Sequence, residues 1–333
     1  MRLTIATAAL FLASGSLCQD VQKSLADNVS ANQELGAFAT VVSNSDFESV
    51  RSLLSGTNQY TLFAPSDAAL KAANVDTSNT TAVLDILKYH VIAGKIKSTE
   101  LKTLQFPTTV LNDTSIVNLP NNKSQVLGVS KNAQDVSVSY GLKSAKVIKA
   151  DLESSNGITH IIDQVLLPPV SPSETAKAAN LTTLMDLLAK SNLTSTIDGF
   201  KGATIFAPSN EALKSLDTSK MNATALTDLL KYHVITSTVG YSSDLKDGLL
   251  ATVQGSNVNI KNNNGAITVN NAKVVTPNVL TSNGVVHVID TVLMPGQANS
   301  FNDKNTYNSA SGLTISTWAT GVLVLSGMVL PQL

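Results

Sequence analysis

The sequence predicts two tandem copies of one α+β domain, because three blocks of residues recur in the same order and each copy places helical patterns before strand patterns. The first copy contains YTLFAPSDAALKA (60–72), LDILKYHVI (84–92) and NGITHIIDQVLLP (156–168), and the second contains ATIFAPSNEALKS (203–215), LTDLLKYHVI (226–235) and NGVVHVIDTVLMP (283–295).

The spacing of the blocks shows where the copies differ in length. The offset between the copies is 143 positions in the first two blocks and 127 positions in the third, so the second copy lacks 16 residues between them. Insertions of this size belong in surface loops, and we expect this one in 105–130 of the first copy. A repeat this long is a duplicated globular domain, because solenoid units have about 20–50 residues.

The first block predicts a strand that runs into a helix. Residues 60–63 (YTLF) are β-prone, and Pro65 ends the strand. Ser66 is then a good N-cap for the helix that follows, and Ser209 takes the same place in the second copy.

The second block predicts an amphipathic helix. The residues that share one face of this helix are Val83, Leu87, His90 and Val91. The spacing therefore places His90, and likewise His233 of the second copy, on or beside the buried face. The neighbouring Tyr89 and Tyr232 are expected to turn to one side.

The third block predicts a turn followed by a covered strand. Asn156-Gly157 supplies the turn, and the run 158–167 is apolar on both faces, which is typical of a central strand. In the second copy, 258–269 around Asn264-Gly265 predicts a β-hairpin just before this strand.

The boundary between the copies is predicted at the proline-rich segment 169–173 (PVSPS). Such spacers are extended and fairly stiff, so we expect the domains, 20–168 and 174–296, to be held apart as separate beads. The polar segment 297–308 is predicted to be a short stalk.

Both ends of the chain carry targeting patterns. Residues 1–18 have a basic residue, an apolar run and a small-residue site, which predicts a secretory signal peptide cleaved near Cys18. Residues 309–333 form an apolar tail after small residues and a polar spacer, which predicts a GPI-attachment signal with lipid joined at Asn308 or Ser309. A retained C-terminal membrane segment is the alternative.

Composition agrees with an extracellular glycoprotein. The only cysteine is Cys18, so the mature chain is predicted to have no disulfide. Net charge is −1 and charged residues make up 14% of the chain, which leaves no basic stripe for nucleic acid. Sequons for N-glycosylation occur at Asn28, Asn79, Asn112, Asn122, Asn180, Asn192 and Asn222.

The three blocks in this order resemble the fasciclin (FAS1) domain family. The features that carry the resemblance are a Thr-hydrophobic-Phe-Ala-Pro-Ser block, a Tyr-His pair on the next helix, and an Asn-Gly-x-x-His-x-Ile-Asp strand, each present twice. The resemblance covers about 20–168 and 171–296. It implies, for each copy, a wedge-shaped β-sandwich with a layer of helices.

The resemblance also implies a function. Fasciclin proteins are extracellular or lumenal, are often GPI-anchored and serve adhesion and matrix contact, and the combination of features here is similar to fungal surface members. The Tyr-His region binds integrins in some animal members, so the resemblance makes Tyr89, His90, Tyr232 and His233 binding candidates. No Arg-Gly-Asp motif is present.

Catalysis and metal binding are disfavoured by the residue patterns. Ser66, His90 and Asp163 recur as Ser209, His233 and Asp290, which is the composition of a hydrolase triad. However, Ser66 is a predicted helix cap with no Gly-x-Ser-x-Gly elbow around it. Two histidines per copy also fall short of a zinc ligand set. We therefore expect no catalytic residue, no metal and no cofactor.

The resulting prediction is a non-catalytic, GPI-anchored cell-surface glycoprotein that serves adhesion or cell-wall and matrix organisation. Its expected partners are matrix or wall glycans, cell-surface proteins or further copies of itself. Two alternatives remain open at this point: a lumenal or vacuolar membrane-tethering protein, and a carbohydrate-binding module.

Overall fold

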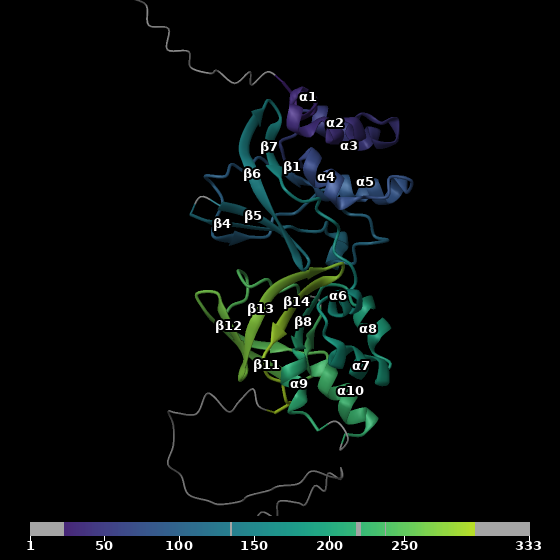
Figure 1. The fold of residues 1–333 in the computed structure, drawn as a ribbon. Helices are drawn as coiled ribbons and strands as arrows, with labels where there is room; N and C mark the ends of the chain where they lie inside the picture. Colours follow the sequence, from purple (N-terminus) through teal and green to yellow (C-terminus); the bar gives the residue numbers. More distant parts are fainter. Residues whose placement is uncertain (1–22, 134, 218–220, 237, 297–333) are drawn as a thin grey trace, which may run out of the picture. The chain divides into compact units, whose positions relative to one another are not determined.

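The computed structural model describes residues 23–133, 135–217, 221–236 and 238–296. The predicted signal peptide, stalk and GPI signal lie outside the described residues. The two copies have closely similar orders of helices and strands, and in both the helices precede most of the strands, which confirms the α+β prediction (Figure 1).

The first copy starts with helices and ends with strands. Its elements are α1 (Leu25–Ala31), η1 (Gln33–Leu35), α2 (Gly36–Ser43), η2 (Ser45–Phe47), α3 (Glu48–Ser55), β1 (Tyr60–Pro65), α4 (Asp67–Ala73), α5 (Thr80–Tyr89), β2 (Val91–Ala93), β3 (Leu104–Gln105), η3 (Pro120–Asn122), β4 (Gly128–Asn132), β5 (Asp135–Tyr140), β6 (Lys143–Ser154) and β7 (Gly157–Ile162).

The second copy follows the same plan. Its elements are α6 (Pro172–Ala178), α7 (Thr182–Lys190), α8 (Thr194–Gly199), β8 (Ala203–Pro208), α9 (Asn210–Lys214), α10 (Ala223–Tyr232), β9 (Val234–Ile235), β10 (Gly248–Ala251), β11 (Asn257–Asn263), β12 (Ala266–Val269), β13 (Ala272–Thr281) and β14 (Gly284–Ile289).

Each copy has one seven-stranded sheet with a parallel pair near one end. The strand orders are β2-β1-β7-β6-β5-β4-β3 and β10-β11-β12-β13-β14-β8-β9. The strand β7 lies between β1, to which it is parallel, and β6, and all six of its residues are buried. This confirms the covered strand, although β7 ends at Ile162 and not at the expected residue 167.

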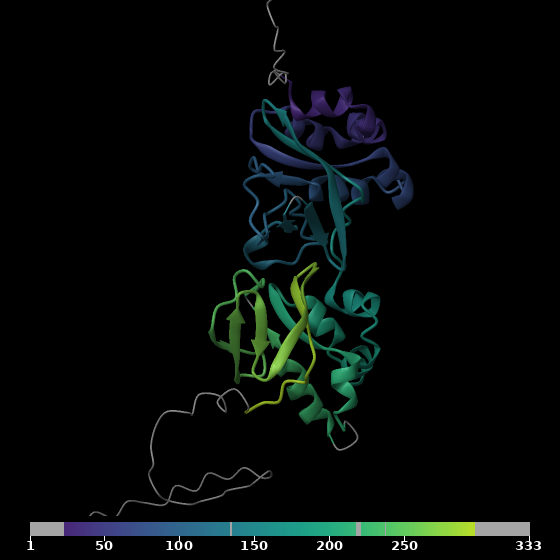
Figure 2. The same cartoon turned by 60° about the vertical axis from the view of Figure 1, so that its left-hand side comes forward.

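The sheet folds over on itself because its longest strand is irregular. Register shifts interrupt the pairing of β6 with β7, and bulges of this kind bend a strand. As a result Phe63 and Ile162, from one half of the sheet, share a core with Val129 and Val138 from the other half. A second core joins the helices to β1 and β7. Each copy is therefore a β-sandwich with a helical layer, and Figure 2 shows the same separation of helices and strands after rotation.

Two local predictions from the sequence can be compared with this fold. Asn264 and Gly265 have φ of 53° and 93° and connect β11 to β12, which confirms the hairpin. Val91 lies in β2 and not on the helix, because α5 ends at Tyr89 and His90 is its C-cap.

The extra length of the first copy falls in two places. The connection between β3 and β4 is 106–127, whereas the corresponding connection between β10 and β11 is only 252–256. The β5–β6 hairpin is also longer: Val138 pairs with Ala145, while Val269 pairs with Ala272 after a shorter turn. The first of these places lies in the predicted stretch, and the second was not foreseen.

The expectation of separate beads is wrong, because the connection 106–127 packs against the second copy within one compact unit. The backbone N–H of Asn118 donates to the Ser282 carbonyl oxygen at 2.8 Å. The buried Gln125 donates its Nε2 to the Thr281 carbonyl oxygen at 3.0 Å. The predicted linker is also short, since Ser171 caps α6 and Pro172 is already helical.

One difference between the copies leaves a cavity in the second. Leu184 on α7 takes the place that Phe38 has on α2. The correspondence follows from the residues just before them, because Ala37 N donates to Asp67 and Thr183 N donates to Asn210 in the same way. The ring of Phe38 is 6.5 Å from that of His90. In the second copy an apolar cavity of about 30 Å³ remains beside His233 and Leu184.

We expect Leu184→Phe to fill this cavity and to raise the free energy of unfolding by about 0.5–1 kcal/mol. The reciprocal change, Phe38→Leu, should lower stability by a similar amount and serves as the matched control. Denaturant unfolding of both variants would measure this. A clear loss of stability in Leu184→Phe would mean that the site is already fully packed.

Candidate functional site

The two histidines of the Tyr-His pairs are buried and use both ring nitrogens on the backbone. His90 is 1% exposed; its Nδ1–H donates to the Ile86 carbonyl oxygen at 2.7 Å, and its Nε2 accepts the Leu166 N–H at 3.0 Å. His233 makes the same pair of bonds, to Leu229 and Leu293. Each imidazole is therefore neutral and joins the end of a helix to the chain that follows the covered strand.

The tyrosines beside them are also inside the protein, and not turned aside as expected. Tyr89 is fully buried and donates its hydroxyl to the Val126 carbonyl oxygen at 2.9 Å. Tyr232 is fully buried and donates to the Asn257 carbonyl oxygen at 2.7 Å. The burial of Tyr89, Tyr232 and their histidines does not fit the role of direct binding residues, because none presents a surface to a partner.

The second histidine of each copy satisfies a backbone group that the bulge leaves unpaired. His160 accepts the Asp151 N–H at Nδ1, 3.2 Å away, and donates from Nε2 to the Ile96 carbonyl oxygen at 3.0 Å. Asp151 lies at the bulge with φ of 59°, where the ladder is interrupted. His287 repeats both bonds in the second copy. These histidines are part of the sheet's architecture.

The serines and aspartates of the triad hypothesis are likewise engaged with the backbone. Ser66 Oγ accepts the Ala69 N–H and Ser209 Oγ accepts the Ala212 N–H, as helix caps. Each aspartate accepts a backbone N–H, Asp163 from Lys146 and Asp290 from Lys273. Among the described residues no group of three or more histidine, cysteine, aspartate or glutamate side chains is arranged to hold a metal.

Buried neutral histidines predict that the protein loses stability in mild acid. Burial lowers the pKa of His90, His233 and His287 from 6.5 to about 4. Between these values the unfolded chain binds protons that the folded chain does not. The stability that each neutral histidine contributes to the folded state is therefore fully present above about pH 6.5 and is lost as the pH falls towards 4. The loss is at most about 3 kcal/mol per histidine.

The denaturant concentration at the midpoint of unfolding should decrease as the pH is lowered from about 6.5 to 4. A midpoint that does not change with pH would contradict the prediction. Asp85 acts in the opposite sense. Its burial, and then the nearby Asp113, raise its pKa above the usual 3.8, so its contribution is lost as the pH rises through its folded-state pKa.

The Asn-Gly pair before the covered strand does more than form a turn. Asn156 is 2% exposed; its Oδ1 accepts the Leu25 N–H at 2.8 Å, and its Nδ2 donates to the carbonyl oxygens of Leu54 and Gly56. It thereby joins α1 and α3 to β7. Asn283 takes the same place in the second copy and donates to the Ile197 carbonyl oxygen. The repetition of this buried asparagine was visible in the sequence, but its partners were not.

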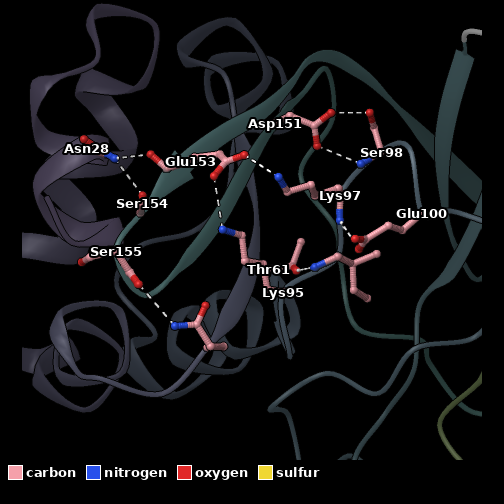
Figure 3. A network of polar contacts seen from close by, with 12 residues as sticks. Asn28, Thr61, Lys95, Lys97, Ser98, Glu100, Asp151, Glu153, Ser154 and Ser155 are labelled. Atoms are coloured by element: carbon pink, nitrogen blue, oxygen red, sulfur yellow. Dashed lines mark hydrogen bonds and ion pairs between the residues drawn. The ribbon is translucent and has the colours of Figure 1, made fainter. Parts of the chain in front are cut away.

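A network of polar contacts on the first copy is shown in Figure 3. Lys95 and Lys97 both pair with Glu153, at 3.3 and 2.7 Å, and hydrogen bonds from these lysines lower the pKa of that carboxyl. Asp151 accepts from both the backbone N–H and the hydroxyl of Ser98. Glu153 is therefore paired with two cations and Asp151 is held by a neutral serine, which gives this group the character of a stabilising surface network.

The second copy keeps one part of this network, the pair Ser242 and Asn278, but replaces its two lysines. Ile96 N donates to Thr61 Oγ1 at 2.9 Å, and Gly240 N donates to Thr204 Oγ1 at 2.8 Å, so the residues on either side of these positions correspond. Val239 and Tyr241 therefore stand where Lys95 and Lys97 stand in the first copy. The Tyr241 ring stacks on Phe106, with 4.2 Å between centroids, and joins the two copies.

The sequons differ in accessibility. Asn28 lies within α1 and donates Nδ2 to the Glu153 carbonyl oxygen at 3.0 Å and to Ser154 Oγ at 2.7 Å, so both amide hydrogens are used (Figure 3). Asn79 and Asn222 are exposed N-caps that accept through Oδ1 only. The remaining sequon asparagines are exposed as well: Asn112, Asn122, Asn180 and Asn192.

Within the described ranges, no helix has both the length and the apolar character that a membrane crossing needs.

The chain is similar to proteins of one family. A model of the fasciclin domain matches residues 33–168 and 179–295. A fasciclin-like arabinogalactan protein of Arthroderma benhamiae is 30% identical over 284 residues, which are 82% of this chain and 67% of that protein. Transforming growth factor-beta-induced protein ig-h3 of Sus scrofa is 27% identical, over 80% of this chain and 39% of its own length.

Human periostin is 28% identical over 76% of this chain, which spans only 30% of that protein. Among solved structures, a FAS1 domain pair from the insect cell adhesion molecule Fasciclin I aligns over 80% of this chain and 98% of its own, with 20% identity and a TM-score of 0.39. The match of the family model over most of the sequence shows that the chain belongs to the fasciclin family, with two fasciclin domains in tandem.

Proposed function

We propose that this chain is a non-catalytic, GPI-anchored glycoprotein of the cell surface that mediates adhesion or organises the wall or matrix around the cell. The observation that carries the proposal is the match of the fasciclin domain model to two segments of the chain, together with a relative named as a fasciclin-like arabinogalactan protein. The absence of catalysis is supported by the use of the repeated polar side chains, since Ser66, His90 and Asp163 are all bonded to the backbone.

Presentation at a surface suits such a protein. A weak contact gains strength when many copies are held on one membrane, because avidity multiplies individual affinities. Six exposed sequon asparagines support a glycan-bearing ectodomain, and Asn28 is left out of the proposal because its amide is engaged. Its partners would be wall or matrix glycans, cell-surface proteins or another copy of the chain.

Two measurements test this function. Treatment of intact cells with a phosphatidylinositol-specific phospholipase should release the protein, and loss of the gene should reduce adhesion or alter the wall. If the protein stays with the cells after phospholipase treatment and is found on an internal membrane, the alternative of a lumenal or vacuolar tethering protein would be favoured. Normal adhesion and a normal wall in cells that lack the protein would contradict the proposal.

A further inference from the structure

A cleft of about 600 Å³ lies where the long connection of the first copy meets the segment that follows β9 in the second copy. This volume is within the range of about 300–1,000 Å³ that is usual for small-molecule sites. The residues that define its chemistry are Phe106, Thr108, Lys123, Ser124, Tyr241 and Asp244. Both copies contribute, so the cleft exists only in the tandem protein.

Tyr241 gives this cleft a polar group that the fold leaves unused. The residue is 8% exposed and its ring stacks on Phe106, while its hydroxyl is not one of the buried, unpartnered atoms of the described residues and is therefore open to the cleft. Burial raises the pKa of Tyr241, so the hydroxyl stays protonated and can donate as well as accept. By contrast, Tyr89 and Tyr232 are fully buried and their hydroxyls are bonded to the backbone. Tyr140 is 6% exposed and resembles Tyr241 in having a hydroxyl that is not bonded to the backbone, but it lies outside the cleft.

The lining indicates the class of ligand. Lys123 and Asp244 carry opposite charges, so the cleft has no excess charge to select an anion or a cation. The hydroxyls of Thr108 and Ser124 join that of Tyr241 as groups that donate and accept. A neutral ligand with many hydroxyls fits such a lining. We propose that this cleft between the two domains is a saccharide-binding site.

Fold requirements alone do not explain Tyr241. At the equivalent place in the first copy the side chain is Lys97, which pairs with Glu153, and that copy folds with the same backbone hydrogen bonds. A leucine or phenylalanine in place of Tyr241 would have supplied the contact with Phe106, so packing does not require the hydroxyl that Tyr241 adds to the wall of the cleft. A ligand in the cleft can bond to this hydroxyl, which both donates and accepts.

The saccharide has two possible sources. One is a glycan of the surroundings, which would make the cleft the binding site of the proposed surface function, on which this inference then rests. The other is the chain's own glycan at Asn122. That asparagine is exposed at the end of η3, and the next two residues of its sequon, Lys123 and Ser124, line the cleft.

The experiment uses the full chain produced with its glycans. Binding of N,N′-diacetylchitobiose and of a β-1,3-linked glucose tetrasaccharide would be measured by calorimetry for the wild type, Asn122→Gln and Tyr241→Phe. Tyr140→Phe is the matched control, because this substitution also removes a tyrosine hydroxyl but at a site outside the cleft. Thr108→Val is a second cleft variant in case Tyr241→Phe folds poorly.

If the ligand is external, the wild type and Asn122→Gln bind alike, and Tyr241→Phe weakens binding about tenfold while Tyr140→Phe does not. If the chain's own glycan fills the cleft, only Asn122→Gln binds added saccharide. Failure of both proteins to bind either saccharide at millimolar concentration overturns the site, as does unchanged affinity in both Tyr241→Phe and Thr108→Val. Normal adhesion of cells without the protein would reject the surface function and leave a measured saccharide site standing.

Discussion

Gly284→Ala is expected to unfold the second copy, with a loss of about 4 kcal/mol or more. The φ of Gly284 is 155°, and a Cβ built there would lie 1.9 Å from the Ala203 carbonyl oxygen on the neighbouring parallel strand. Neither atom can move away, because Gly284 and Ala203 are the first pair of the ladder between β14 and β8. Gly157→Ala should do the same to the first copy, where the clash with the Tyr60 oxygen is at 2.0 Å.

The control for this prediction is Gly199→Ala, since a Cβ at Gly199 meets no atom within 4 Å. Circular dichroism and denaturant unfolding of the three variants would compare them directly. A Gly284→Ala protein as stable as Gly199→Ala would show that the start of the ladder can rearrange, contrary to the close approach seen here.

His90→Ala is expected to destabilise the first copy by about 3–5 kcal/mol, and His233→Ala the second by a similar amount. The change removes a buried ring and leaves the Leu166 N–H without its acceptor at a site that water does not reach. The Ile86 carbonyl oxygen loses its side-chain donor at the same time.

Thermal and denaturant unfolding would measure this loss, with Lys88→Ala on the same helix as a control of small effect. A binding role predicts the opposite pattern. If His90→Ala kept its stability and lost attachment to cells or wall material, the structural role of the histidine would be wrong.

Much of the fold could be predicted from the sequence because the repeat marks its elements twice. The covered strand, the helix cap at Ser66 and the hairpin at Asn264 follow from local patterns of polarity and turn residues, which are properties of neighbouring residues. The length of β7 and the placement of Val91 were less well predicted, because an apolar run does not show where the backbone leaves the sheet.

The roles of the repeated polar residues were only partly predictable. Helical spacing placed His90 at the buried face, but it could not show that Leu166, 76 positions later, would bind its ring. Helical spacing placed Tyr89 and Tyr232 at the side of the helix, because it does not show that the sheet covers them and that the carbonyl oxygens of Val126 and Asn257 accept from their hydroxyls. A polar group that is satisfied from a distant part of the chain looks the same in sequence as one that waits for a ligand.

The sequence by itself determined that this protein is a duplicated fasciclin chain, since a repeated order of blocks needs no knowledge of contacts. The tertiary structure decided how the copies relate and where a ligand can bind. The connection 106–127 read as a free surface loop, yet it holds the second copy through Asn118, Gln125 and the stacking of Phe106 on Tyr241. Such contacts join residues more than a hundred positions apart, and their geometry is set by packing rather than by local composition.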